Sequence, residues 1–155
     1  MPVPTPSEGA ALRQLGMLRG DELPLLAAHW LAAYDSPALV RLAGLDGTEG
    51  WLIDQLWPEV LSDLGVGVTA DEVTWSRAVA WQVAAWRSGD RSLREVMAAV
   101  RAAHNLLGYP DEAQEAWHLN GLDDELMSAW GRPADQVWLE VEAVLKAWAA
   151  RAPRF

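Results

Sequence analysis

Cysteine is absent from this chain of 155 residues, and lysine and phenylalanine each occur only once. Without cysteine, the chain has neither disulfide bonds nor thiolate ligands and nucleophiles. No apolar run approaches the roughly 18 residues that a membrane-spanning helix needs, and no secretion signal with an apolar core and a cleavage site opens the sequence. We therefore expect a soluble, cytoplasmic protein that does not bind membranes. The preference for arginine over lysine is typical of a GC-rich bacterial genome.

Positive charge is also scarce, because 12 basic residues stand against 22 acidic ones and leave a net charge of -10. This balance argues against nucleic acid as a partner, since phosphate neutralisation requires a basic surface. The charge is unevenly distributed: residues 1–76 carry -8, residues 77–110 carry +3 and residues 111–155 carry -5. Solvated ion pairs with acidic neighbours are the ordinary explanation for the arginines of this basic middle, Arg87 and Arg91 among them. An anion site is the alternative.

Apolar residues follow a helical period. No stretch alternates with period two for more than a few residues, and Ala, Leu, Glu and Arg dominate the periodic segments. The sequence therefore predicts an all-α fold, a compact single-domain bundle of six to eight helices, some of them short. We expect a flexible, proline-rich tail over residues 1–9 and one helical domain over residues 10–152.

Caps and stops mark the ends of several expected helices. Ser36 precedes a first-turn proline, Ser92 and Glu95 form a capping box, and Gly89 ends the helix before them. The other expected elements are a short helix over residues 11–18, a helix capped by Asp21, a helix over residues 51–64 that Pro58 kinks or restarts, a helix opened by Thr69 and Glu72, a polar helical segment over residues 111–119, a short acidic helix over residues 123–130, and a last helix from Pro133.

Several of the expected helices have an apolar stripe that indicates the core. The predicted core positions include Leu23, Leu26, Ala27, Trp30 and Tyr34; Ile53, Leu56, Trp57, Val60 and Leu64; Leu93, Met97, Val100, His104 and Leu107; and Val137, Trp138, Val141, Val144, Leu145 and Trp148. A histidine among such residues is more often a hydrogen-bonded core residue than a metal ligand.

Tryptophan is the abundant aromatic residue, with ten copies, three of them within residues 75–86. On a helix, Trp75 and Trp86 lie within about 20° of each other, whereas Trp81 points about 120° to 140° away. Either this helix is covered on both sides, or Trp81 faces a cleft or solvent. Trp51 and Trp117 also lie off the apolar stripes. Because indole is common at interfaces and ligand pockets, Trp51, Trp81 and Trp117 are the candidate functional aromatics.

Catalytic signatures are missing from the sequence. It contains no GxSxG, HExxH, GxxxxGK[ST] or GxGxxG motif. Glu115 and His118 form a single ExxH pair, whereas a di-iron bundle needs two pairs and two further glutamates. The three histidines have no local spacing that supports a zinc site. We therefore expect no cofactor, no metal and no catalytic residue.

Three classes of function remain. The first is a non-enzymatic interaction protein, such as an adaptor, an inhibitor or an immunity protein, whose acidic surface and outward tryptophans bind a basic protein partner. The second is a binder of a small aromatic or cationic ligand in a Trp-lined cavity between helices. The third is an enzyme without a recognisable motif. The first class needs the fewest unseen features, with Trp51, Trp81, Trp117, His118, Arg87 and Arg91 as its binding residues.

Overall fold

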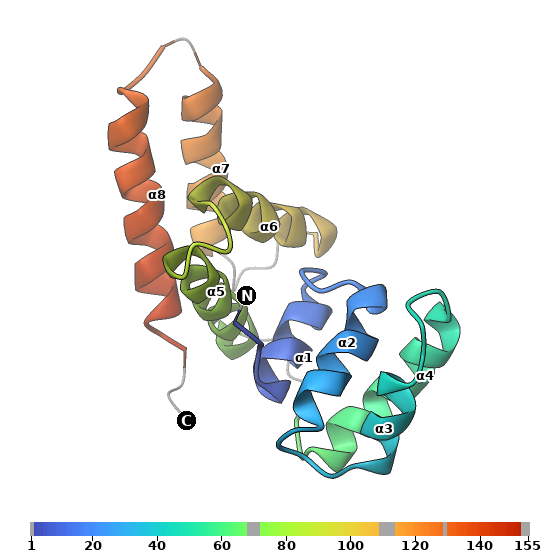
Figure 1. Cartoon of the computed structure of the whole chain (residues 1–155). Helices are drawn as coiled ribbons and strands as arrows, with labels where there is room; N and C mark the ends of the chain where they lie inside the picture. The colour runs from blue at the N-terminus through green and yellow to red at the C-terminus, as the bar shows by residue number, and fades with distance from the viewer. Residues whose placement is uncertain (1, 68–71, 109–113, 129, 153–155) are drawn as a thin grey trace. The chain divides into compact units, whose positions relative to one another are not determined.

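A computed structural model describes residues 2–67, 72–108, 114–128 and 130–152, and these residues form eight α-helices, one short 3-10 helix and no strand (Figure 1). The all-α prediction is confirmed, and the number of helices agrees with it. The chain divides into two compact units: an N-terminal unit over Val3–Thr69, and a C-terminal unit over Ala70–Phe155 to which Met1–Pro2 also belong. The main contacts between helices lie within each unit, and one helical domain over residues 10–152 remains a prediction.

The N-terminal unit contains four α-helices and the 3-10 helix. Their bounds are α1 Pro6–Gln14, η1 Gly20–Glu22, α2 Leu23–Trp30, α3 Pro37–Ala43 and α4 Gly50–Asp63. Helix α3 packs against both α2 and α4. The predicted stripes of α2 and α4 form this core, in which Leu23, Leu26, Ala27, Trp30, Ile53, Leu56 and Val60 are buried together with Leu39 and Leu42 of α3. Tyr34 is exposed because α2 ends four residues before it.

Helix α1 begins four residues before the predicted start of the domain at residue 10. Thr5 caps it in a reciprocal capping box with Glu8, and the proline at its first position needs no N–H partner there. The Trp30 indole donates a 2.7 Å hydrogen bond to the Pro4 carbonyl oxygen. Residues 4–9 therefore belong to the packed unit, where a flexible tail was predicted, because the prolines open a helix instead of preventing one.

The C-terminal unit is a ring of four helices, α5 Glu72–Arg87, α6 Leu93–Leu106, α7 Gln114–Met127 and α8 Ala134–Ala149. Helix α5 contacts α6 and α8, and α7 contacts the same two helices. Figure 1 shows α7 and α8 as an antiparallel pair. The predicted box of Ser92 with Glu95 caps α6, and Gly89 follows α5 with φ +83°. The predicted cap at Thr69 and the start of the segment at residue 111 lie outside the described residues.

Three expectations about individual helices of the two units were wrong. Helix α7 runs without interruption through Gly121, where two separate segments were predicted, because one exposed glycine weakens a helix without ending it. Leu107 is exposed because it caps the end of α6 and does not continue its inner face. Asp21 lies within η1, so it does not cap α2. Helix α4 continues through Pro58.

Helix α5, which carries Trp75, Trp81 and Trp86, is buried on more than one side. Trp75 stacks on Trp148 of α8 with ring centroids 5.5 Å apart. Trp81 is also buried, with 6% of its surface exposed, while Trp86 is half-buried near Lys146. Of the two alternatives for Trp81, the covered helix is therefore the one observed.

Candidate functional site

The six residues singled out in the sequence are divided between the two units. Trp51 lies in the first turn of α4 in the N-terminal unit, with 66% of its surface exposed. Trp81 and Arg87 belong to α5, Arg91 follows that helix, and Trp117 and His118 belong to α7. Within the C-terminal unit they form two separate groups, one around Trp81 and one on α7.

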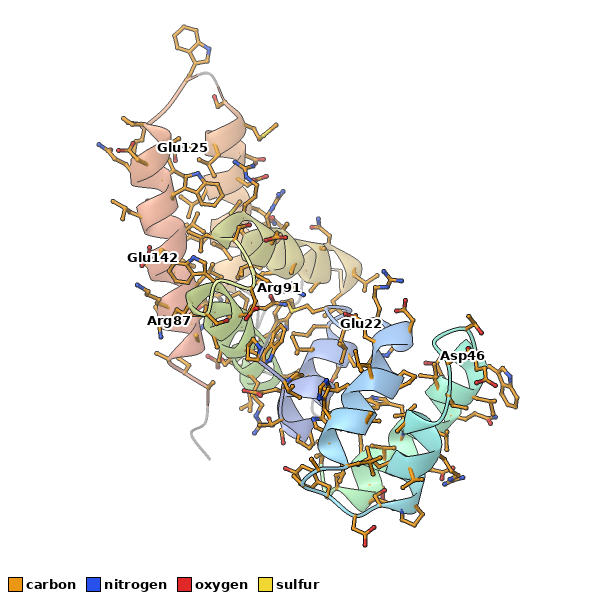
Figure 2. All side chains as sticks on the ribbon, in the orientation of Figure 1. Glu22, Asp46, Arg87, Arg91, Glu125 and Glu142 are labelled. Atoms are coloured by element: carbon orange, nitrogen blue, oxygen red, sulfur yellow. The ribbon has the colours of Figure 1, made fainter. Side chains whose placement is uncertain are left out.

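Trp81 and Arg91 are brought together. Arg91, which is labelled in Figure 2, follows the end of α5. The guanidinium carbon lies 5.6 Å from the centre of the Trp81 ring, and Arg91 Nη1 donates a 3.2 Å hydrogen bond to Gln82 Oε1. Among the described residues, Trp81 Nε1 and Gln82 Nε2 are buried and find no acceptor. Arg91 thus covers an indole face, and two buried N–H donors lie on adjacent residues of α5.

Arg87, Arg94 and Arg101 of the basic middle have different surroundings. Arg101 forms a 2.5 Å ion pair with Asp123, as the ordinary reading of these charges predicts. Arg94 instead lies 5.2 Å from the centre of the Trp138 ring. Arg87 is exposed at the end of α5. Arg101 is therefore held in an ion pair, whereas Arg91 and Arg94 lie on indole faces.

Trp117 and His118 lie side by side on α7. Trp117 is 54% exposed, and its ring makes an edge contact with His104 at 5.2 Å. His118 Nε2 lies 2.8 Å from Glu140 Oε1 of α8. His104 itself is a buried core histidine, as predicted; its Nδ1 lies 3.3 Å from the Asn120 amide, and burial lowers its pKa.

The most exposed tryptophan is one that the sequence analysis did not select. Trp130 lies in the turn between α7 and α8 with 87% of its surface exposed, and Met127, the last residue of α7, is 79% exposed. We call Met127, Ser128 and residues 130–133 the hairpin tip. Trp130 was predicted to end a short acidic helix, and this was wrong because α7 stops at Met127. The sequence signal that could have indicated an exposed Trp130 was its position in a short loop between two amphipathic helices.

A clamp between Glu125 and Arg132 closes the hairpin tip. Arg132 Nε and Nη2 donate 2.8 Å hydrogen bonds to the two carboxylate oxygens of Glu125, and the Arg132 backbone N–H donates a third, of 3.1 Å. Figure 2 shows Glu125 beside the turn that joins the two helices. Gly131 has φ +149°, and a Cβ there would lie 3.1 Å from Glu125 Cγ. The close approach of the chain to Glu125 therefore favours glycine at this position.

Glu140 extends the clamp into a network of four charged or titratable groups. It accepts a 2.5 Å hydrogen bond from Arg132 Nη1 and also contacts His118. Hydrogen bonds from the Arg132 guanidinium lower the pKa of Glu125 to about 2, and those from Arg132 and His118 lower the pKa of Glu140. Both carboxylates therefore stay charged near neutral pH.

The hairpin carries more negative than positive charge. Between residues 123 and 140 there are five carboxylates, Asp123, Asp124, Glu125, Asp135 and Glu140, against the single guanidinium of Arg132. Asp123 pairs with Arg101, and the network engages both glutamates. Asp124 and Asp135 form no ion pair with any residue in the described part of the chain. Asp124 and Asp135 therefore leave negative charge close in sequence to Met127 and Trp130 of the hairpin tip.

Glu115 and His118, the ExxH pair that suggested metal chemistry, each contact a different charged residue. Glu115 of the ExxH pair forms an ion pair with Arg151, while His118 contacts Glu140. Within the described ranges, no three His, Asp or Glu side chains lie in a group that could hold a metal ion. No helix of the described residues is long and apolar enough to cross a membrane.

Comparison of the chain with protein-family models, with curated proteins and with solved structures gives no match. The function of the chain is therefore inferred from the geometry of the described residues.

Proposed function

We propose that this protein is a non-enzymatic, acidic helical interaction protein, of the adaptor, inhibitor or immunity type, that binds another protein in the cytoplasm. One observation carries the proposal: Trp51, Trp117 and Trp130 each expose more than half of their surface on a chain of net charge -10. Exposed tryptophans are costly to leave in water and are enriched among the residues that dominate binding energy at protein interfaces. The acidic surface would steer a basic partner toward them. The cytoplasmic location rests on the absence of cysteine.

The test uses the full chain, immobilised and exposed to extract of the cells that naturally produce it. We expect a specific protein to be retained at low salt and released at high salt, because screening weakens attraction between exposed charges. A Trp117→Ala, Trp130→Ala double variant should retain much less of it. Retention of no protein, or retention that depends on neither salt nor the exposed tryptophans, would contradict the proposal.

A second candidate is sequestration of a small molecule at α5. It is favoured by the buried Trp81 Nε1 and Gln82 Nε2, which lack acceptors among the described residues. Buried donors without acceptors are costly, and a ligand carrying carbonyl or carboxylate oxygens would satisfy them. The sequence analysis favoured an aromatic or cationic ligand, whereas Arg91 already occupies one face of Trp81 and favours an anionic one.

Titration with a panel of small carboxylates tests this candidate. Binding should raise the melting temperature and change tryptophan emission, and Gln82→Leu should abolish both effects. If neither signal changes with any compound, sequestration of an acceptor-bearing ligand at α5 is excluded and the interaction protein stands alone.

A further inference from the structure

Hydrogen bonds hold the main chain at Trp130 and at Arg132. The Trp130 backbone N–H donates a 3.1 Å hydrogen bond to Ser128 Oγ, and that of Arg132 donates one to Glu125 Oε1. The guanidinium of Arg132 reaches both helices, through Glu125 on α7 and Glu140 on α8. Because these two backbone N–H groups are already hydrogen-bonded, a partner that covers Trp130 has less main chain to order.

Two carboxylates that form no ion pair with a described residue lie close in sequence to the exposed apolar side chains. Asp124 precedes Met127 by three residues on α7, and Asp135 lies in the first turn of α8. An anchor of this kind, apolar in the centre and charged at the rim, has the composition of a protein interface hot spot. Trp117 is less suited as the anchor because its ring already contacts His104.

The sign of the charge selects the class of partner. Five carboxylates against one guanidinium over residues 123–140 would repel nucleic acid and anionic lipid. The same charges attract lysine and arginine, whose cationic groups also bind the face of an exposed indole. A basic polypeptide surface matches both the charge and the indole.

We propose that the hairpin tip is the docking surface for a basic protein segment, with Trp130 as the anchor, Met127 as its apolar neighbour, and Asp124 and Asp135 as partners for lysine or arginine. This inference rests on the proposed function, since it names the surface and the chemistry of the partner. The Glu125, Arg132 and Glu140 network positions Trp130 and need not contact the partner.

The experiment selects binders from a displayed library of random peptides on the full-length chain. Enriched peptides are synthesised, and their affinities are measured at low and high salt for the unchanged chain, Trp130→Ala and Leu106→Ala. Leu106 is a matched control, because it is an exposed apolar residue of the same unit outside the hairpin tip. Circular dichroism and the melting temperature of each variant verify that it is folded.

We expect enrichment of peptides with net positive charge and a loss of about tenfold or more in affinity for Trp130→Ala, as for an interface hot spot. Leu106→Ala should bind like the unchanged chain. An Asp124→Asn, Asp135→Asn double variant should bind more weakly, with a smaller salt dependence. Any of four results would overturn the inference: no enrichment, enrichment of neutral or acidic peptides, equal binding by Trp130→Ala, or Trp130-dependent binding to DNA or to vesicles of anionic lipid.

The failure of this inference is distinguishable from failure of the proposed function. If the extract experiment recovers a salt-sensitive protein partner that Trp130→Ala still binds fully, the docking surface is wrong and the interaction protein remains. If the extract yields no partner at all, the proposed function fails together with the inference.

Discussion

Arg132 bridges the end of α7 to the chain that precedes α8, with both of its 2.8 Å hydrogen bonds to Glu125 made across the turn that carries Trp130. A bidentate pair of this kind fixes direction as well as distance, because the planar guanidinium fits the planar carboxylate. The main chain two residues after the exposed indole is thereby fixed. The ion pair between Arg132 and Glu125 thus supports the turn on which Trp130 is proposed to bind a partner.

The stability of the hairpin should depend on the ionisation of Glu125. Its pKa is lowered from 4.5 to about 2, so the unfolded chain binds a proton at a higher pH than the folded chain. The stabilisation is therefore complete above about pH 4.5 and is lost as the pH falls from there to about 2. Glu125→Gln should lower the stability of the hairpin at neutral pH and flatten its dependence on pH, measured by urea unfolding and by amide exchange of α7 and α8.

Asp124→Asn is the matched control for this experiment. It removes a neighbouring carboxylate that forms no ion pair with a described residue, so the pH dependence should be retained. If Glu125→Gln and Asp124→Asn give the same acid profile, the clamp does not stabilise the turn.

His104 should make the C-terminal unit less stable in mild acid. Burial lowers its pKa from 6.5, so the unfolded chain binds the proton first as the pH falls. Stability should therefore be constant above about pH 6.5 and decline below it, by at most about 1.4 kcal/mol per pH unit for one proton. The free energy of urea unfolding is measured from about pH 7.5 to about pH 5. His104→Gln should remove this decline, whereas His29→Gln, which changes an exposed histidine, should keep it.

Two glycines should respond in opposite ways to alanine. A Cβ at Gly9 would lie 2.8 Å from the Trp30 ring, which is buried and cannot move freely, because it donates to Pro4 and stacks on Trp57. Gly9→Ala should therefore destabilise the N-terminal unit by about 1 to 3 kcal/mol. Gly121→Ala, on α7 with no atom within 4 Å of its Cβ, should stabilise the C-terminal unit by about 0.5 to 1 kcal/mol. Thermal unfolding of both variants tests this, and a change of the same sign in both would refute it.

The indole N–H should contribute more to the free energy of unfolding at Trp30 than at Trp81. Both rings are buried, but Trp30 Nε1 donates to the Pro4 carbonyl, while Trp81 Nε1 has no acceptor among the described residues. Trp30→Phe leaves a buried carbonyl without its donor, which adds about 1 to 3 kcal/mol to the loss of volume that both variants share. The loss in unfolding free energy should therefore be larger for Trp30→Phe. Equal losses would show that the 2.7 Å hydrogen bond is not stabilising.

Most of the helices could be predicted because their signals are local. The cap at Ser36, the box of Ser92 with Glu95 and the stop at Gly89 each depend on side chains within a few residues, and all three occur. The buried stripes of α4 and α8 follow from helical periodicity in the same way. The start of α1 was missed because the same prolines are typical of a tail and of a helical first turn.

The candidate site could be predicted only in part, because it depends on contacts between segments. Arg91 meets Trp81 from ten residues away, and Arg132 meets Glu125 across a turn. A helical wheel shows neither contact. It also gave no reason to select Trp130, whose exposure follows from the end of α7 at Met127. Trp51 and Trp117 were recognised because they lie off the apolar stripes, and both are exposed.

The most direct test of the proposed docking surface is site-specific photo-crosslinking in extract of the cells that naturally produce the chain. A photoreactive phenylalanine analogue replaces Trp130 in one preparation and the exposed Leu106 in the other. We expect position 130 to crosslink to one protein through a peptide of net positive charge, with a yield that falls at high salt, and position 106 to give no such product. No crosslinked protein at position 130, or the same products at both positions, would contradict the account.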